Sequence, residues 1–250
     1  ISKLKITVKV TNSKQSATYN GAEPTINTDT TVTLTDNGDS SAPSFVSNEL
    51  SFSVTKETGV NAGTYTLTPS AIANSGYSVD NYDITCPTGT FTINKAALTV
   101  TANSENITYG DDKPTFSVSY SGFVNNETQS VLEGSVVFAC DYVRYGNAGS
   151  YSITPSGLKS DNYEITFNNG TLTVNKKQIT ATISLSSYSI YVTDYVLSVA
   201  IPSVTFSGLV NGDSLTVTYT ATGSETTDPT TLYEDAQLEK GVYTINAVFS

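Results

Sequence analysis

Histidine, methionine and tryptophan are absent from this sequence of 250 residues, and only two cysteines are present. The absence of histidine excludes Ser-His-Asp and Cys-His nucleophilic centres, and it removes the commonest side-chain ligand of transition metals. The absence of tryptophan argues against a dedicated carbohydrate cleft. No pair of carboxylates is marked by contrasting environments. We therefore expect no catalytic residues and no enzymatic activity.

Charge is scarce and mostly of one sign. Only 14% of the residues are charged, and the 23 Asp and Glu residues outnumber the 12 Lys and Arg residues, which gives a net charge of -11. Phosphate backbones and anionic lipid surfaces repel such a chain, so we expect no nucleic-acid binding. No apolar run approaches the roughly 18 residues of a membrane span, so we expect no membrane insertion. The first residues lack a signal-peptide profile, and we expect any export signal or wall anchor outside this segment.

Internal repetition is what the sequence has in abundance. Residues 61–70 read Asn-Ala-Gly-Thr-Tyr-Thr-Leu-Thr-Pro-Ser, and residues 147–156 read Asn-Ala-Gly-Ser-Tyr-Ser-Ile-Thr-Pro-Ser. Further on, Asp-Asn-Tyr occurs at 80–82 and again at 161–163. A closing Gly-Thr-x-Thr-x-Asn-Lys segment ends each of these two copies at a lysine, Lys95 or Lys176.

These repeats predict three tandem modules, covering residues 1–94, 95–175 and 176–250. The third module is a divergent copy, because it matches the second only in patches. It is either incomplete or an atypical terminal copy, because the sequence reaches residue 250 before any Asp-Asn-Tyr or closing segment. Its clearest match is residues 208–214, Gly-Leu-Val-Asn-Gly-Asp-Ser, which correspond to Gly-Phe-Val-Asn-Asn-Glu-Thr at 122–128.

Alternating apolar and polar residues predict an all-β fold. Tyr82, Ile84 and Cys86 would line a core face, as would their counterparts Tyr163, Ile165 and Phe167. The pattern predicts small antiparallel β modules, each either an immunoglobulin-like sandwich or a β-grasp-like sheet with at most a very short helix. Helix signals gather at residues 126–134, where an asparagine can cap the start and a glycine can end it.

The motifs of the second module resemble those of the MBG domain of YGX type. The resemblance rests on Thr-Tyr-Gly-Asp at 108–111, Gly-Phe-Val-Asn-Asn-Glu at 122–127, the strand at 149–157 and the closing segment to residue 176. The first module reads Tyr-Asn-Gly at its equivalent front. The resemblance implies a repeat of large bacterial surface proteins and adhesins, and it transfers no catalytic residues.

We therefore expect a non-enzymatic, monomeric, extracellular segment located at the cell surface or in the cell wall. It would act in cell adhesion as a stalk or spacer within an adhesin. The alternative is that the modules themselves bind ligands and recognise host mucin glycans or a host protein.

Three residues of the second module are candidates for ligand binding: Tyr142, Arg144 and Tyr145. Aromatic rings and a guanidinium group can stack on a sugar or on a partner surface. Tyr142 also continues the alternation of Phe138 and Cys140, so a place in the core is the competing interpretation.

No cofactor and no metal site are expected, with calcium as the alternative. Oxygen ligands could come from residues 36–39 or from Asp111 and Asp112, although neither set has the spacing of a calcium loop. Lys95 and Lys176 each follow an asparagine, which suggests either isopeptide links or solvated lysines that discourage edge pairing. Cys86 and Cys140 lie in different modules and are expected to be buried thiols.

Overall fold

The protein was analysed as a computed structural model, which describes residues 3–34, 44–184, 197–198, 203–223, 230–231, 237–238 and 243–249. Its chain forms two compact units. Unit 1 contains residues 1–104, 116–140 and 152–171, and unit 2 contains residues 105–115, 141–151 and 172–250. Residues of the predicted second module are thus shared between the two units.

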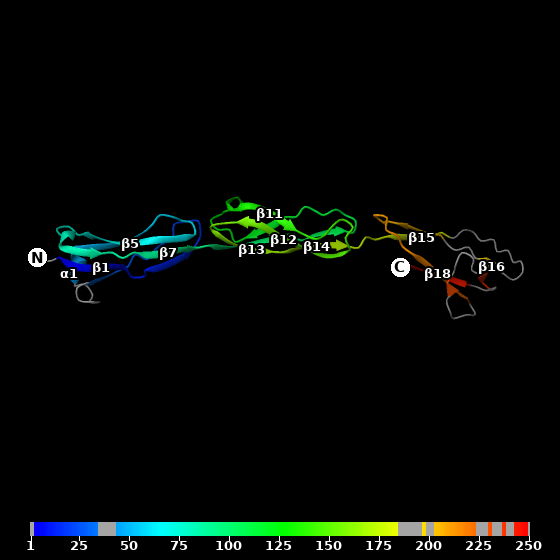
Figure 1. The fold of residues 1–250 in the computed structure, drawn as a ribbon, viewed down its shortest axis with the longest axis horizontal. Helices are drawn as coiled ribbons and strands as arrows, with labels where there is room; N and C mark the ends of the chain where they lie inside the picture. The colour runs from blue at the N-terminus through cyan, green and yellow to red at the C-terminus, as the bar shows by residue number, and fades with distance from the viewer. Residues whose placement is uncertain are drawn as a thin grey trace. The chain divides into compact units, whose positions relative to one another are not determined.

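The first module lies in unit 1 and divides its strands between two sheets (Figure 1). The first sheet has the order β3-β1-β6, from β1 (Leu4–Val10), β3 (Thr30–Leu34) and β6 (Tyr82–Thr85). The second has the order β2-β7-β5-β4, from β2 (Lys14–Thr18), β4 (Leu50–Lys56), β5 (Gly63–Ala73) and β7 (Gly89–Asn94). The opening segment of the module therefore contributes β1 to one sheet and β2 to the other.

The part of the second module in unit 1 repeats this pairing. Its central strand, β8, pairs antiparallel with β10 and parallel with β13, and β11 pairs antiparallel with β12. The strands are β8 (Ala96–Ala102), β10 (Val118–Ser121), β13 (Tyr163–Asn168), β11 (Glu133–Ala139) and β12 (Gly149–Lys159).

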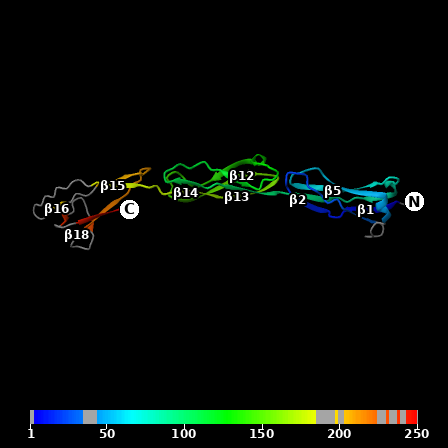
Figure 2. The ribbon, with the colours of Figure 1, turned by 180° about the vertical axis from the view of Figure 1, so that it is seen from behind.

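Unit 2 contains the remaining strands, apart from the first two residues of β14, and several of these strands are labelled in Figure 2. Its pairs are β9 with β14, β15 with β17 and β16 with β20, while β18 lies between β19 and β21. The bounds are β9 (Glu105–Thr108), β14 (Gly170–Asn175), β15 (Thr180–Ser184), β16 (Leu197–Ser198), β17 (Ser203–Ser207), β18 (Val217–Gly223), β19 (Thr230–Thr231), β20 (Gln237–Leu238) and β21 (Tyr243–Phe249).

The prediction of an all-β fold is confirmed, and the described residues include only three short helical segments. These are α1 (Ser44–Glu49) and the 3₁₀ helices η1 (Val79–Asn81) and η2 (Gln129–Val131). Among the described residues, no helix is long and apolar enough to cross a membrane. The sheets are mixed rather than purely antiparallel, because β1 pairs with β6, β2 with β7, β8 with β13 and β9 with β14 in parallel.

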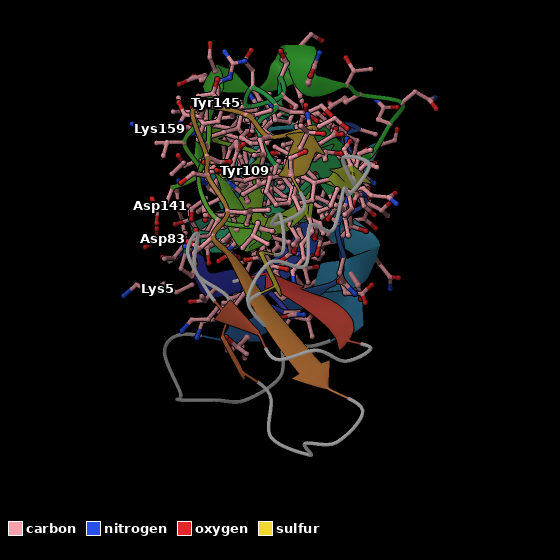
Figure 3. All side chains as sticks on the ribbon, turned by 90° about the vertical axis from the view of Figure 1, so that its right-hand side faces the viewer. Lys5, Asp83, Tyr109, Asp141, Tyr145 and Lys159 are labelled. Carbon is pink, nitrogen blue, oxygen red and sulfur yellow. The ribbon has the colours of Figure 1, made fainter. Side chains whose placement is uncertain are left out.

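The alternation correctly identified the core faces. Tyr82 and Tyr163 are 5% and 2% exposed, while their neighbours Asp83 and Glu164 point to solvent. Lys5 and Asp83, both labelled in Figure 3, are register partners on β1 and β6. One apolar cluster of unit 1 draws its buried members from both modules: Val10, Tyr19, Val54, Leu67, Phe91, Ile93, Ala96, Leu98, Val100 and Tyr163.

Residues 126–134, where the sequence contains helix signals, form less than two turns of helix. Asn125 and Asn126 have φ angles of 52° and 57°, and the amide of Glu127 donates to the carbonyl of Val124 at 2.9 Å. This is a β-turn with two left-handed central residues, a conformation that asparagine tolerates better than most residues. Only η2, over three residues, follows it.

Candidate functional site

The three residues predicted to bind a ligand lie in one loop after β11, but they differ in exposure. Tyr142 is fully buried, and its hydroxyl donates to the backbone carbonyl of Asp111 at 2.8 Å. Arg144 is exposed and Tyr145 is half-buried. Figure 3 marks Tyr145 and also Tyr109, which directly follows β9.

Arg144 is engaged by three neighbours in unit 2. Its Nε donates to the carbonyl of Gly110 at 3.1 Å and lies 3.4 Å from Oδ1 of Asp112, and its guanidinium stacks 4.9 Å from the ring centroid of Tyr145. Tyr145 has a φ of 64°, a left-handed conformation that is unusual for a bulky residue. The loop therefore holds residues 109–112 in place through both the backbone and an ion pair.

The first module contains a matching brace. Nζ of Lys56 lies 2.8 Å from Oε1 of Glu23, which follows Gly21 by two residues as Asp112 follows Gly110. The same ammonium lies 4.2 Å from the ring centroid of Tyr65. Because the Lys56 side chain is only 3% exposed, this cation has a structural role. The parallel favours a structural role for Arg144 as well.

The braced segments are turns that follow an equivalent tyrosine, and we call them the tyrosine turns, residues 19–21 and 109–111. In the first module the Tyr19 hydroxyl donates to Oε1 of Glu127 at 2.6 Å. The Tyr163 hydroxyl donates to Oε2 of the same carboxylate, also at 2.6 Å. One carboxylate of the second module thus joins a tyrosine from each module.

Electrostatics at this carboxylate follow from the geometry. The hydrogen bond to Glu127, together with burial, raises the pKa of Tyr19 to about 12, because loss of the phenolic proton would place two negative charges side by side. Burial, followed by the bond to Glu127, also raises the pKa of Tyr163. Charge-assisted hydrogen bonds of this length are about twice as strong as neutral ones.

Further polar contacts lie near the boundary between the two modules in unit 1. The Asn162 side chain accepts from the amide of Ala62 at 2.9 Å and donates to Oδ1 of Asn61 at 3.0 Å. The Lys95 ammonium donates to the carbonyl of Ser160 at 2.8 Å. Strand β7 ends at Asn94 and β8 begins at Ala96, so Lys95 is the single residue between the strands of the two modules.

An open pocket of about 730 Å³ lies beside these contacts in unit 1. Its lining combines charges of both signs with apolar side chains: Asn94, Lys95, Glu133, Leu158, Lys159, Ser160, Asp161, Tyr163, Glu164, Ile165 and Phe167. The volume falls within the range of small-molecule sites, which is about 300–1,000 Å³.

The sequence did not reveal the Tyr19–Glu127 contact, because its residues are 108 positions apart. The available signal was the recurrence of a tyrosine turn and of an acid at the corner in successive modules. The sequence likewise gave no indication that Asn162, within the repeated Asp-Asn-Tyr segment, would contact the preceding Asn-Ala-Gly loop.

The other candidate chemistry is placed as follows. Among the described residues no group of three or more Asp, Glu, Cys or His is arranged to hold a metal ion. The calcium candidate at residues 36–39 lies outside the described residues, whereas Asp111 accepts from the Thr108 amide at 2.8 Å and Asp112 pairs with Arg144. Cys86 and Cys140 are half-buried rather than buried, and burial raises the pKa of the Cys86 thiol.

Comparison with solved structures gives a weak similarity to the three N-terminal domains of the bacteriophage RB49 Highly Immunogenic Outer Capsid protein (Hoc). The identity is 14%, the alignment covers 82% of this chain and 73% of that one, and the TM-score of 0.26 is too low to support an argument. No curated protein matches the sequence. The profile of the MBG domain (YGX type) matches residues 6–92 and 98–173. The chain therefore belongs to the MBG domain family of YGX type and contains two tandem copies of that domain.

Proposed function

We propose that this chain is a spacer segment of a bacterial cell-surface adhesin, in which consecutive modules are held in a fixed relation and present a more distal binding region. The main support is the apolar cluster of unit 1. Its buried residues Phe91 and Ile93 come from the first module, and Leu98, Val100 and Tyr163 come from the second. A boundary between modules that is packed like a domain interior resists bending, because bending would expose apolar surface to water at a free-energy cost of about 25 cal/mol per Å².

The connection between the modules supports the same role. With Lys95 as the single residue between β7 and β8, the chain has little slack in which to flex. The pair Asn61–Asn162 and the bond from Tyr19 to the Glu127 carboxylate add polar contacts between the two modules. An extracellular location at the cell surface or in the cell wall belongs to this proposal.

Small-angle X-ray scattering of the full chain tests the spacer function. A rod-like profile that is unchanged between low and high salt is expected if the modules are held mainly by apolar contacts. A compact globular profile, or one that fits only a freely jointed chain across Lys95, would overturn the proposal. A chain with a Gly-Ser linker inserted after Lys95 provides the flexible reference.

A second candidate function, recognition of mucin glycans or of a host protein, is favoured by the pocket beside Lys95. Its mixture of Lys159, Glu133 and Phe167 offers hydrogen bonds, charge and an apolar face within one site. A glycan array and a mucin pull-down with the full chain would detect it. Saturable binding lost in Lys159→Ala but retained in Arg144→Ala and Tyr145→Ala would assign recognition to the pocket, and the reverse would assign it to the loop. No saturable binding would reject this function.

A further inference from the structure

Unit 2 contains a second contact between a tyrosine turn and an acid. The Tyr109 hydroxyl donates to Oδ1 of Asp213 at 3.2 Å, as Tyr19 donates to Glu127. The backbone amides of the two tyrosines also make equivalent hydrogen bonds. Each donates at 2.8 Å to the backbone carbonyl of the asparagine that ends the last strand of its own module, which is Asn94 for Tyr19 and Asn175 for Tyr109. The turn is thus anchored identically in both modules.

The acids also occupy equivalent turns, which we call the acidic corners, residues 124–127 and 210–213. In each corner the amide of the acid donates at 2.9 Å to the carbonyl of a valine three residues earlier. The two central residues are left-handed in both, with φ angles of 52° and 57° at Asn125 and Asn126, and of 56° and 74° at Asn211 and Gly212. This conformation determines where the carboxylate that follows is placed.

A glycine of the tyrosine turn lies against the acidic corner in each case. A Cβ added at Gly21 would lie 2.7 Å from Cβ of Asn125, and one added at Gly110 would lie 3.1 Å from Cγ2 of Val210. Both glycines have positive φ, of 73° and 97°. Gly21 is therefore constrained both by its backbone conformation and by the close approach of the acidic corner. At Gly110 the conformation is the stronger constraint, because a Cβ there would require Val210 to shift by only a few tenths of an ångström.

We propose that the tyrosine turn of an MBG module is a docking site whose partner is the acidic corner of another module of the same kind. The tyrosine supplies the donor, the glycine supplies the space, and the carboxylate of the corner supplies the acceptor. This combination selects a small left-handed turn bearing an acid at its fourth position, which is a feature of these modules themselves. The inference rests on the proposed spacer function and names the residues that set its junctions.

Distances between nitroxide labels in the full chain test this docking. For the first junction the labels replace the exposed residues Lys9 and Thr166, in a background in which Cys86 and Cys140 are changed to serine. For the second junction they replace Asn106 and Thr205, both of unit 2. We expect one narrow distance distribution for each pair. Tyr19→Phe should widen the first at least about twofold, and Tyr109→Phe should do the same for the second.

Gly21→Ala has a well-matched control. Gly76 is also left-handed, with a φ of 89°, but a Cβ there would meet no atom within 4 Å. Both substitutions strain the backbone, so only the contact with the acidic corner separates them. Gly21→Ala should shift or widen the first distribution, and Gly76→Ala should leave it unchanged. Gly110→Ala is the equivalent variant for the second junction, with Gly76→Ala again as its control.

The outcomes separate docking from the spacer function. Narrow distributions that persist in Tyr19→Phe, Tyr109→Phe and Gly21→Ala would overturn the docking proposal and leave the spacer intact. A broad first distribution in the unsubstituted chain would overturn both. Circular dichroism spectra matching those of the parent chain establish that the variants are folded, and Tyr77→Phe, at a tyrosine that is 49% exposed, serves as the control for loss of a hydroxyl.

Discussion

The contact of Tyr19 with Glu127 and the contact of Tyr109 with Asp213 each join a tyrosine turn to an acidic corner, and we call them the first and second junctions. The two junctions differ in how deeply the contact is buried. At the first, Glu127 accepts from two tyrosines at 2.6 Å, and Tyr19 is only 6% exposed. At the second, Asp213 receives the Tyr109 hydroxyl at 3.2 Å, and Tyr109 is half-buried. The comparison indicates that the polar contact selects the partner, whereas the apolar surroundings determine how firmly it is held.

One sequence difference accompanies this contrast. Aspartate is one methylene shorter than glutamate, so the carboxylate of Asp213 lies closer to its own backbone than that of Glu127 and reaches less far toward the tyrosine turn.

Leu98→Ala is expected to produce the largest effect and to test whether the first two modules share a core. Leu98 is 1% exposed within the cluster that contains residues of both modules. Its truncation should lower the free energy of unfolding by about 2–5 kcal/mol. Urea unfolding followed by exchange of amide protons should show both modules destabilised together. Loss confined to the second module would contradict a shared core, and Ile183→Ala, at a side chain that is 52% exposed, is the control.

Glu127→Ala should come next and exceed Asp213→Ala. It removes the acceptor of two charge-assisted bonds, each worth roughly 1.5–3 kcal/mol, so a loss of about 3 kcal/mol is expected against about 1 kcal/mol for Asp213→Ala. A double-mutant cycle of Glu127→Ala with Tyr19→Phe measures the part that crosses the junction. A coupling energy near zero would show that Glu127 serves only Tyr163.

Alkaline pH should weaken the first junction through its tyrosines. The pKa of Tyr19 is raised to about 12 by the bond to Glu127 and by burial, and that of Tyr163 is raised by burial and by its bond to the same carboxylate. The unfolded chain, with tyrosine pKa values near 10, binds fewer protons than the folded chain between about pH 10 and pH 12. The free energy of unfolding should therefore fall across this range, because the proton is lost first from the unfolded state.

Urea titrations at a series of alkaline pH values measure this slope. Tyr19→Phe should make the decline shallower, because it removes a group whose pKa is raised in the folded chain. An equal slope in the parent chain and in Tyr19→Phe would contradict the assignment to Tyr19.

Arg144→Ala should have the smallest effect, about 1 kcal/mol or less, because its ion pair with Asp112 is largely exposed. Lys56→Ala, which removes the buried counterpart in the first module, should cost more. Thermal unfolding of the two variants compares them directly. Equal costs would show that the braces are not distinguished by burial.

Local pattern was sufficient to predict the strands and their inward faces. Tyr82 and Tyr163 were assigned to the core because alternation is a property of neighbouring residues, and burial along β6 and β13 follows it. Parallel pairing of β1 with β6 was not predicted, since the choice of partner strand depends on the whole module rather than on a window of sequence.

The candidate site was harder to predict from the sequence than the strands were. Tyr142, Arg144 and Tyr145 were chosen for their chemistry, and the structure shows that Tyr142 and Arg144 both bind backbone carbonyls of the segment 110–111. What these residues brace, a turn that meets an acid about a hundred positions away, could be seen only when two modules were folded together.

The second module carries both halves of the contact, since its Glu127 accepts from Tyr19 of the first module and its Tyr109 donates to Asp213, in the segment that the sequence predicts as a third module. A copy with both halves can be inserted into or deleted from a row without altering its neighbours. Gene duplication and unequal crossing-over can therefore change the length of such a row in whole modules, with every new junction already supplied with its donor, its glycine and its carboxylate.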